Sequence, residues 1–144
     1  MTMIEPSIWS NLHGASTHFP IALMLVSAFC DCASLLFSKA EQKQRALRSA
    51  ATITIVLGAL GSYAAVATGL VMTKWQVWGH GTLLRHHQFV WPAFALMVGL
   101  ATWRVFARRN PDDKLPPAYL GLMLLAAVLM GGAGYWGGEV LNHG

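Results

Sequence analysis

Four long apolar stretches alternate with short polar segments along the chain. They cover residues 19–37, 49–73, 89–103 and 115–138, and the only charged residue inside them is Asp31. A helix that crosses a bilayer needs about 20 predominantly apolar residues. Three stretches reach or approach that length, and residues 89–103 do so if their helix extends at both ends. The pattern therefore predicts membrane-spanning helices over about 19–37, 50–72, 84–107 and 117–138.

These elements predict an all-α fold, an integral membrane four-helix up-down-up-down bundle that forms one domain over residues 1–144. Composition agrees, because 55% of the residues are hydrophobic and only 11% are charged, whereas a soluble domain carries about 25% charged residues. The first eight residues contain no Lys or Arg, so we expect no removable signal peptide. The bilayer is the expected environment, and the net charge of +4 lies in membrane loops and does not indicate nucleic-acid binding.

The Lys and Arg residues predict the orientation of the bundle. Eight lie in the two loops that follow the first and third helices, and two lie on the opposite side: Lys39, Lys43, Arg45, Arg48, Arg104, Arg108, Arg109 and Lys114 against Lys74 and Arg85. Cytoplasmic loops carry the excess of Lys and Arg in membrane proteins. Both termini and the central loop are therefore expected to face away from the cytoplasm.

All six histidines fall on that outward side, near the ends of the predicted helices: His13, His18, His80, His86, His87 and His143. Imidazole is a neutral nitrogen ligand that tolerates an apolar environment, and bundles commonly hold cofactors between facing helices. The pattern predicts one or two haems held by two histidines each. The chain has no C-x-x-C-H motif, so the haem would be b-type and not covalently attached.

Position along the helices suggests a role for each histidine. His18 and His87 are the best axial pair, since an apolar run follows each of them. His13 and His143 could ligate a second haem, bind a quinone headgroup or contact the haem propionates. His86 and His87 point about 100° apart on a helix, so they should not share one iron. Beside them, Arg85 is a candidate partner for a propionate, with an interfacial anchor as the simpler interpretation.

Small residues recur on the second and fourth predicted helices. Gly61, Ala65 and Gly69 are spaced by four, and the end of the last helix contains five glycines: Gly131, Gly132, Gly134, Gly137 and Gly138. Such a surface allows close helix packing or accommodates a flat ring, and the sequence leaves both interpretations open.

Asp31 is a functional candidate because an intramembrane carboxyl is expensive. The simpler interpretation pairs it with Lys39, Arg45 or a neighbouring hydroxyl. Cys30 and Cys32 flank it and are too few for a disulfide framework, so we expect two buried thiols.

The segment LHGASTHFPIAL at residues 12–23, a histidine at the start of the third helix, and GGEVLNHG at residues 137–144 resemble a family of small bacterial membrane proteins of unknown function. Members open with H-x4-HFPIAL and close with GG-x-LV-x-x-HG, and they occur near or fused to periplasmic cytochrome c modules. His13, His18, His86 or His87, and His143 match the family's histidines. Gly14 departs from the pattern, since a proline is expected there. The resemblance implies four spans in a bacterial inner membrane and a role near periplasmic electron transfer.

The leading hypothesis is a membrane-bound b-type cytochrome subunit that transfers electrons between the quinone pool and a periplasmic cytochrome c or dehydrogenase subunit. It would be an electron-transfer subunit of an oxidoreductase complex and not a free-standing catalyst. Two alternatives remain. One is a haem-free zinc or copper site built from His18, His87, His13 and His143. The other is a structural or assembly subunit whose glycine surfaces dock a second membrane protein.

Overall fold

Four long helices make up the protein in the computed structural model, which describes residues 8–107 and 116–143, with side chains up to residue 140. They are α1 (Ile8–Leu36), α2 (Glu41–Met72), α3 (Gly81–Ala107) and α4 (Pro117–His143). Each contains a segment long and apolar enough to cross a membrane. The predicted all-α, four-span fold is confirmed. Leu, Val and Phe side chains are exposed on the outer surface, for example those of Phe29 and Val128, which suits contact with lipid.

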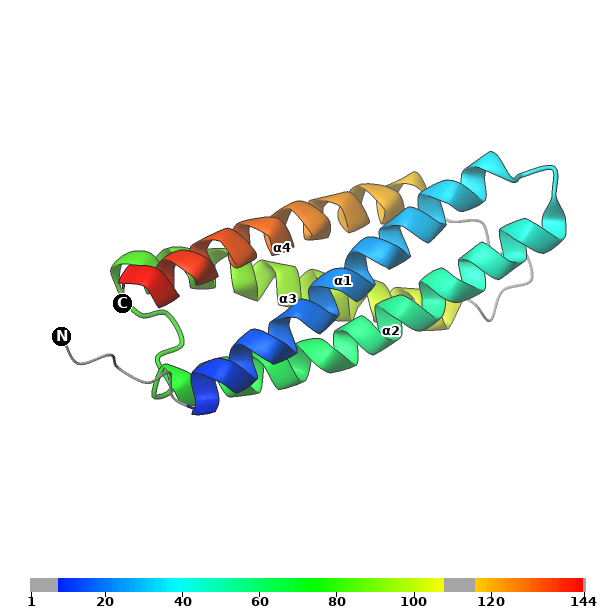
Figure 1. Ribbon diagram of the computed structural model, residues 1–144. Helices are drawn as coiled ribbons and strands as arrows, with labels where there is room; N and C mark the ends of the chain where they lie inside the picture. Colours follow the sequence, from blue (N-terminus) through cyan, green and yellow to red (C-terminus); the bar gives the residue numbers. More distant parts are fainter. Residues whose placement is uncertain (1–7, 108–115, 144) are drawn as a thin grey trace.

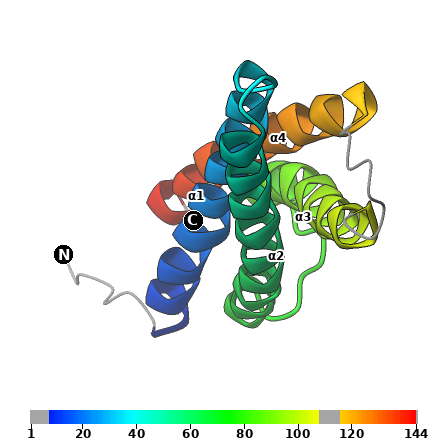
Figure 2. The same cartoon turned by 90° about the vertical axis from the view of Figure 1, so that its right-hand side faces the viewer.

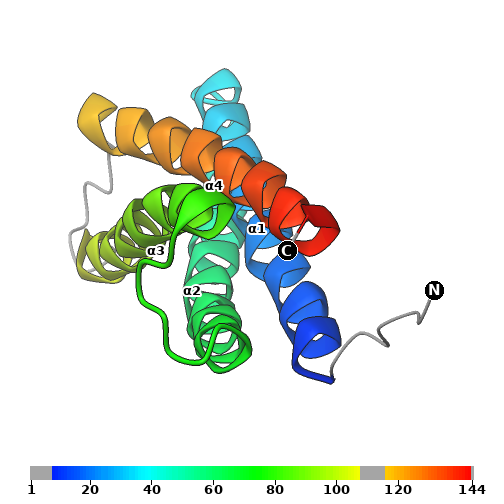
Figure 3. The ribbon, with the colours of Figure 1, turned by 90° about the vertical axis from the view of Figure 1, so that its left-hand side faces the viewer.

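The helices form two antiparallel hairpins that lie against each other. Within the hairpins, α1 packs along α2 and α3 packs along α4, and these contacts are more extensive than those between the hairpins. Figure 1 shows this pairing, and the end views in Figures 2 and 3 show one hairpin crossing over the other. The starts of α1 and α3 and the ends of α2 and α4 lie at one end, which we call the histidine end of the bundle.

Helix α1 begins at Ile8, well before the start near Pro20 that the sequence predicted. Its 29 residues span roughly 43 Å at about 1.5 Å per residue, which exceeds the hydrocarbon thickness of about 30 Å. The apolar pattern identifies only the part of a helix that meets lipid, so it did not include the polar first turns of α1. Pro20 and Pro92 both lie inside helices, and the start of α4 at Pro117 follows the preference of proline for a first helical turn.

A buried ion pair joins the hairpins near the end of the bundle opposite the histidines. An Nη of Arg104 lies 2.9 Å from an Asp31 carboxylate oxygen, and both side chains are almost fully excluded from solvent. Arg104 also donates hydrogen bonds to the hydroxyl of Thr52 and the carbonyl of Arg48, each at 2.9 Å, and its guanidinium lies over the ring of Tyr119. The cluster thus contains residues of all four helices.

This pairing differs from the sequence interpretation, in which Asp31 paired with Lys39, Arg45 or a neighbouring hydroxyl. Arg45 instead pairs with Glu41 on the exposed surface of α2. The sequence placed Arg104 among loop cations, whereas it lies inside α3 and is buried. The two cysteines are free as expected, but only Cys30 is buried, since Cys32 lies on the outer surface.

Candidate functional site

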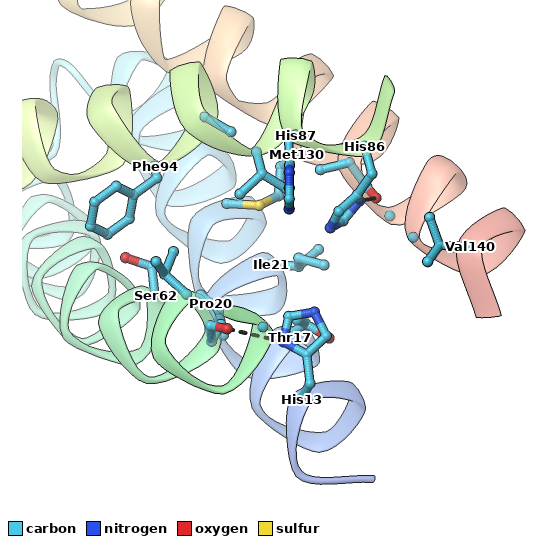
Figure 4. Close-up of a pocket in the computed structure, with 18 of the residues that line it drawn as sticks. His13, Thr17, Pro20, Ile21, Ser62, His86, His87, Phe94, Met130 and Val140 are labelled. Atoms are coloured by element: carbon cyan, nitrogen blue, oxygen red, sulfur yellow. Dashed lines mark hydrogen bonds between the residues drawn. The ribbon is translucent and has the colours of Figure 1, made fainter. Parts of the chain in front are cut away.

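A cavity of about 280 Å³ opens between the hairpins at the histidine end. All four helices contribute to its wall, which is mostly apolar, and His13, His18, His86 and His87 supply its imidazoles. Figure 4 shows His13 on one side of the cavity and His86 and His87 on the other, with their rings directed toward the space between the hairpins. Its volume is close to the lower end of the range for small-molecule sites, about 300 Å³.

His13 projects from the second turn of α1 toward α2. Its Nδ1 lies 3.0 Å from the carbonyl oxygen of Ala65 and 3.3 Å from the hydroxyl oxygen of Thr68. A carbonyl oxygen can only accept a hydrogen bond, so Nδ1 carries the proton and Nε2 keeps its lone pair. The ring lies on Gly69, where an added Cβ would come within 2.8 Å of His13 Cε1.

His86 makes the corresponding contacts between α3 and α4. Its Nδ1 lies 2.9 Å from the carbonyl oxygen of Ala133, so it too donates from Nδ1. Its ring lies on Gly137, where a Cβ would approach His86 Cε1 to 3.2 Å. Glycine at both positions therefore provides the room that each imidazole needs beside the neighbouring helix.

His87 is buried in the same wall and also donates from Nδ1. Its acceptor is the carbonyl oxygen of Trp78, 3.0 Å away, in the segment that joins α2 to α3. The rings of His86 and His87 have centroids 5.7 Å apart and are tilted by 43°. They are thus distinct groups with separate backbone anchors.

The three anchored histidines share one arrangement. Each holds its Nδ1 proton on a backbone carbonyl, which fixes the neutral tautomer and leaves Nε2 as the available nitrogen. Metal-ligating histidines almost always donate their other ring N–H in this way, which orients the ring and raises its basicity. The cavity therefore holds three oriented imidazole side chains in an apolar setting.

The other predicted site residues lie at the margin of the cavity or beyond it. His18 reaches the cavity wall but is exposed. Arg85 is exposed and stacks its guanidinium over the ring of Trp136, 4.9 Å from the centroid. His143 is the last residue of α4, and its side chain lies outside the described residues. Among the residues with described positions, no three His, Cys, Asp or Glu side chains are placed to hold one metal ion.

Sequence reasoning found the histidines and the glycines but did not connect them. The four-residue spacing on α2 and the glycine-rich end of α4 were visible signals, and their interpretation was left open between helix packing and a flat ring. The structure shows that Gly69 and Gly137 accommodate imidazoles, whereas Gly61 and Gly132 accommodate phenyl rings from the partner helix of the hairpin. The carbonyl anchors at Ala65 and Ala133 had no signal in the sequence.

Comparison with known proteins gives one match. A family model described as "Predicted membrane protein (DUF2231)" matches residues 10–144. No curated protein and no solved structure matches the chain.

Proposed function

The chain belongs to the DUF2231 family of predicted membrane proteins, and we propose that it is a b-type cytochrome subunit. In this proposal the cavity between the hairpins holds a haem, and the protein passes electrons between the quinone pool and a periplasmic redox partner. The observation that carries the proposal is the set of three imidazoles whose Nδ1 protons are fixed on backbone carbonyls and whose Nε2 atoms are left for iron.

The chemistry of the cavity wall favours haem over a bare ion. The wall is mostly apolar, and its described residues include no Asp or Glu, which suits a large flat macrocycle whose iron takes neutral nitrogen ligands. It spans facing helices of two hairpins, so one ring can receive ligands from both. The cavity volume of about 280 Å³ is also several times the volume of about 30 Å³ that one water molecule occupies in the liquid.

Bound haem would supply one-electron oxidation and reduction, and the chain would control its setting. The anchored imidazoles of His13, His86 and His87 would surround it, and two of them would ligate its iron, while the apolar wall would keep water from the iron and tune its potential. The Arg85 guanidinium, held over Trp136 near the cavity, offers a cation to a propionate. Nearly all of the described residues lie in the four long helices, an arrangement that suits electron transfer to a partner.

The distribution of charge supports a periplasmic position for the histidine end. Arg104 is buried in the ion pair, so it no longer counts as a loop cation. Seven of the remaining nine Lys and Arg residues fall between the apolar segments of α1 and α2 or of α3 and α4 in the sequence, against Lys74 and Arg85. Three of the seven, Lys43, Arg45 and Arg48, belong to the first turns of α2. By the positive-inside rule, the cavity faces the periplasm of a bacterial inner membrane, where a cytochrome c or a dehydrogenase subunit would meet it.

The test is a dithionite-reduced minus oxidised visible spectrum of the detergent-purified protein, produced with ample haem. We expect Soret and alpha bands of b-type haem, and extraction of the haem into acidified organic solvent because it is not covalently bound. The same spectrum is expected from His80→Ala, a control histidine that is exposed and lies outside the cavity wall. A featureless spectrum would overturn the proposal. Metal analysis of the same sample would then separate a zinc or copper protein from an assembly subunit.

A further inference from the structure

The cavity is built from matching positions of the two hairpins. Every α1 residue in its wall has a counterpart in the α3 wall 73 positions later along the chain. The pairs are His13 with His86, Gly14 with His87, Thr17 with Val90, His18 with Trp91, Pro20 with Ala93, and Ile21 with Phe94. Successive turns of α1 thus face the cavity at positions that are equivalent to those of α3.

Helices α2 and α4 show the same correspondence at a spacing of 68 positions. The wall pairs are Ser62 with Met130, Ala65 with Ala133, Val66 with Gly134, Gly69 with Gly137, Leu70 with Gly138, and Met72 with Val140. The spacing is shorter than 73 because His86 and Ala133 are 47 residues apart, five fewer than the 52 that separate His13 and Ala65. Each hairpin therefore presents an equivalent surface to the cavity.

The correspondence continues into the packed core away from the cavity. At the spacing of 73, Met24 matches Met97 and Ala28 matches Ala101, and all four are buried. At the spacing of 68, three positions that are buried in α2 match three that are buried in α4: Ala51, Ile55 and Gly58 with Tyr119, Met123 and Ala126. Residue types differ in these three pairs and are the same in the two pairs of α1 and α3, whereas all five pairs share burial.

The buried ion pair indicates where an approximate symmetry axis passes between the two hairpins. Asp31 and Arg104 are themselves a matching pair at the spacing of 73, and they contact each other at 2.9 Å. Two equivalent positions can meet in this way when an approximate two-fold axis passes between them. Because both hairpins run in the same direction, that axis lies along the bundle and continues into the cavity at the other end.

His13 and His86 are the one matched pair of histidines in the cavity wall. Their surroundings match as well, since each Nδ1 donates to a matched alanine carbonyl and each ring lies on a matched glycine. The counterpart of His18 is Trp91, and the counterpart of His87 is Gly14. Neither of these histidines therefore has an equivalent ligand across the axis.

We propose that the two hairpins are equivalent halves of one pseudo-symmetric site, with His13 and His86 as the two axial ligands of a single iron. This assignment rests on the proposed haem function and replaces the pair His18 and His87 that the sequence favoured. Two axial ligands approach an iron from opposite faces of the ring, and a two-fold axis through the cavity supplies that relation between identical, identically anchored groups. His87 then adjoins the haem without binding its iron.

The test uses the full-length, haem-loaded protein in detergent and the variants His13→Gly, His86→Gly, His18→Gly and His87→Gly. We expect the wild type to show the low-spin optical and electron paramagnetic resonance spectra of a bis-histidine haem. His13→Gly and His86→Gly should each lose the low-spin signal or the haem, and exogenous imidazole should restore the low-spin signal. His18→Gly and His87→Gly should keep it.

The outcomes separate this assignment from the proposed function. A wild type without haem overturns both, whereas a wild type with low-spin haem that survives in His13→Gly or His86→Gly overturns the assignment alone. Loss of the low-spin signal in His87→Gly, rescued by imidazole, also overturns it. If the glycine variants of the ligands do not fold, Gly69→Ala and Gly137→Ala decide, because each added Cβ crowds one imidazole. Both should shift the low-spin g-values, and unchanged g-values would contradict the assignment.

Discussion

Replacing Arg104 by methionine should strongly destabilise the bundle. The substitution keeps a long side chain but removes the cation 2.9 Å from Asp31, whose side chain is 0% exposed, and two further hydrogen bonds. Removal of one partner of a buried ion pair costs about 3–5 kcal/mol, because an uncompensated charge remains. The free energy of unfolding in detergent, measured by far-UV circular dichroism during denaturation with sodium dodecyl sulfate, should fall by about that amount.

Two further variants make this result specific to the ion pair. Replacement of both partners by apolar residues of similar size is often neutral or stabilising, so Asp31→Leu combined with Arg104→Met should recover most of the loss. Arg45→Met breaks an exposed pair with Glu41 that is one turn away on α2, and such pairs contribute about 0.3–0.5 kcal/mol. If the double variant is as unstable as Arg104→Met, or if Arg104→Met costs no more than Arg45→Met, the buried charge is not the cause.

Three other predictions follow from close contacts, exposure and charge. Gly132→Ala should destabilise the α3–α4 hairpin in the same unfolding assay, because a Cβ would lie 2.4 Å from Phe89 Cδ1. The control Gly121→Ala has open space around it and should be neutral or stabilising by up to about 1 kcal/mol. Equal effects of the two substitutions would contradict this packing. A membrane-permeant maleimide should label Cys32 before Cys30, since only Cys30 is buried, and mass spectrometry of the peptides will show the order. Alkaline phosphatase fused after the last residue should be active in cells, and activity from a cytoplasmic reporter instead would reverse the proposed orientation.

The sequence predicted the membrane-spanning fold because lipid contact selects apolar residues regardless of tertiary detail. It misplaced the start of α1, since hydropathy reports where a helix meets lipid and not where its hydrogen bonding begins. Arg104 was assigned to a loop because an arginine at the end of an apolar run looks like the start of a polar loop when its partner is not known. That partner, Asp31, lies on another hairpin, and no local pattern encodes such a contact.

The candidate site was predictable in kind but not in pairing. Six histidines on one side of the membrane pointed to a ligand site, but the choice of His18 with His87 followed from their places in apolar runs. The structure instead distinguishes His13 and His86 as a matched pair, because each donates to a matched alanine carbonyl and lies on a matched glycine. The repeat that relates them is hard to see in the sequence, because many matched positions differ in residue type, most sharply at Asp31 and Arg104.

The ion pair between the hairpins also constrains the order in which the protein can be made. Asp31 belongs to the first hairpin, which ends at Met72, and Arg104 is then still 32 residues from synthesis, a delay of about 2–6 s at about 5–20 residues per second. During that interval the carboxyl has no arginine beside it, and a polar group without a partner is costly in an apolar environment. Arrival of the second hairpin in the correct orientation supplies the arginine and closes the bundle. The buried ion pair therefore forms only with the second half of the chain, and a chain that stops before Arg104 would lack this partner for Asp31.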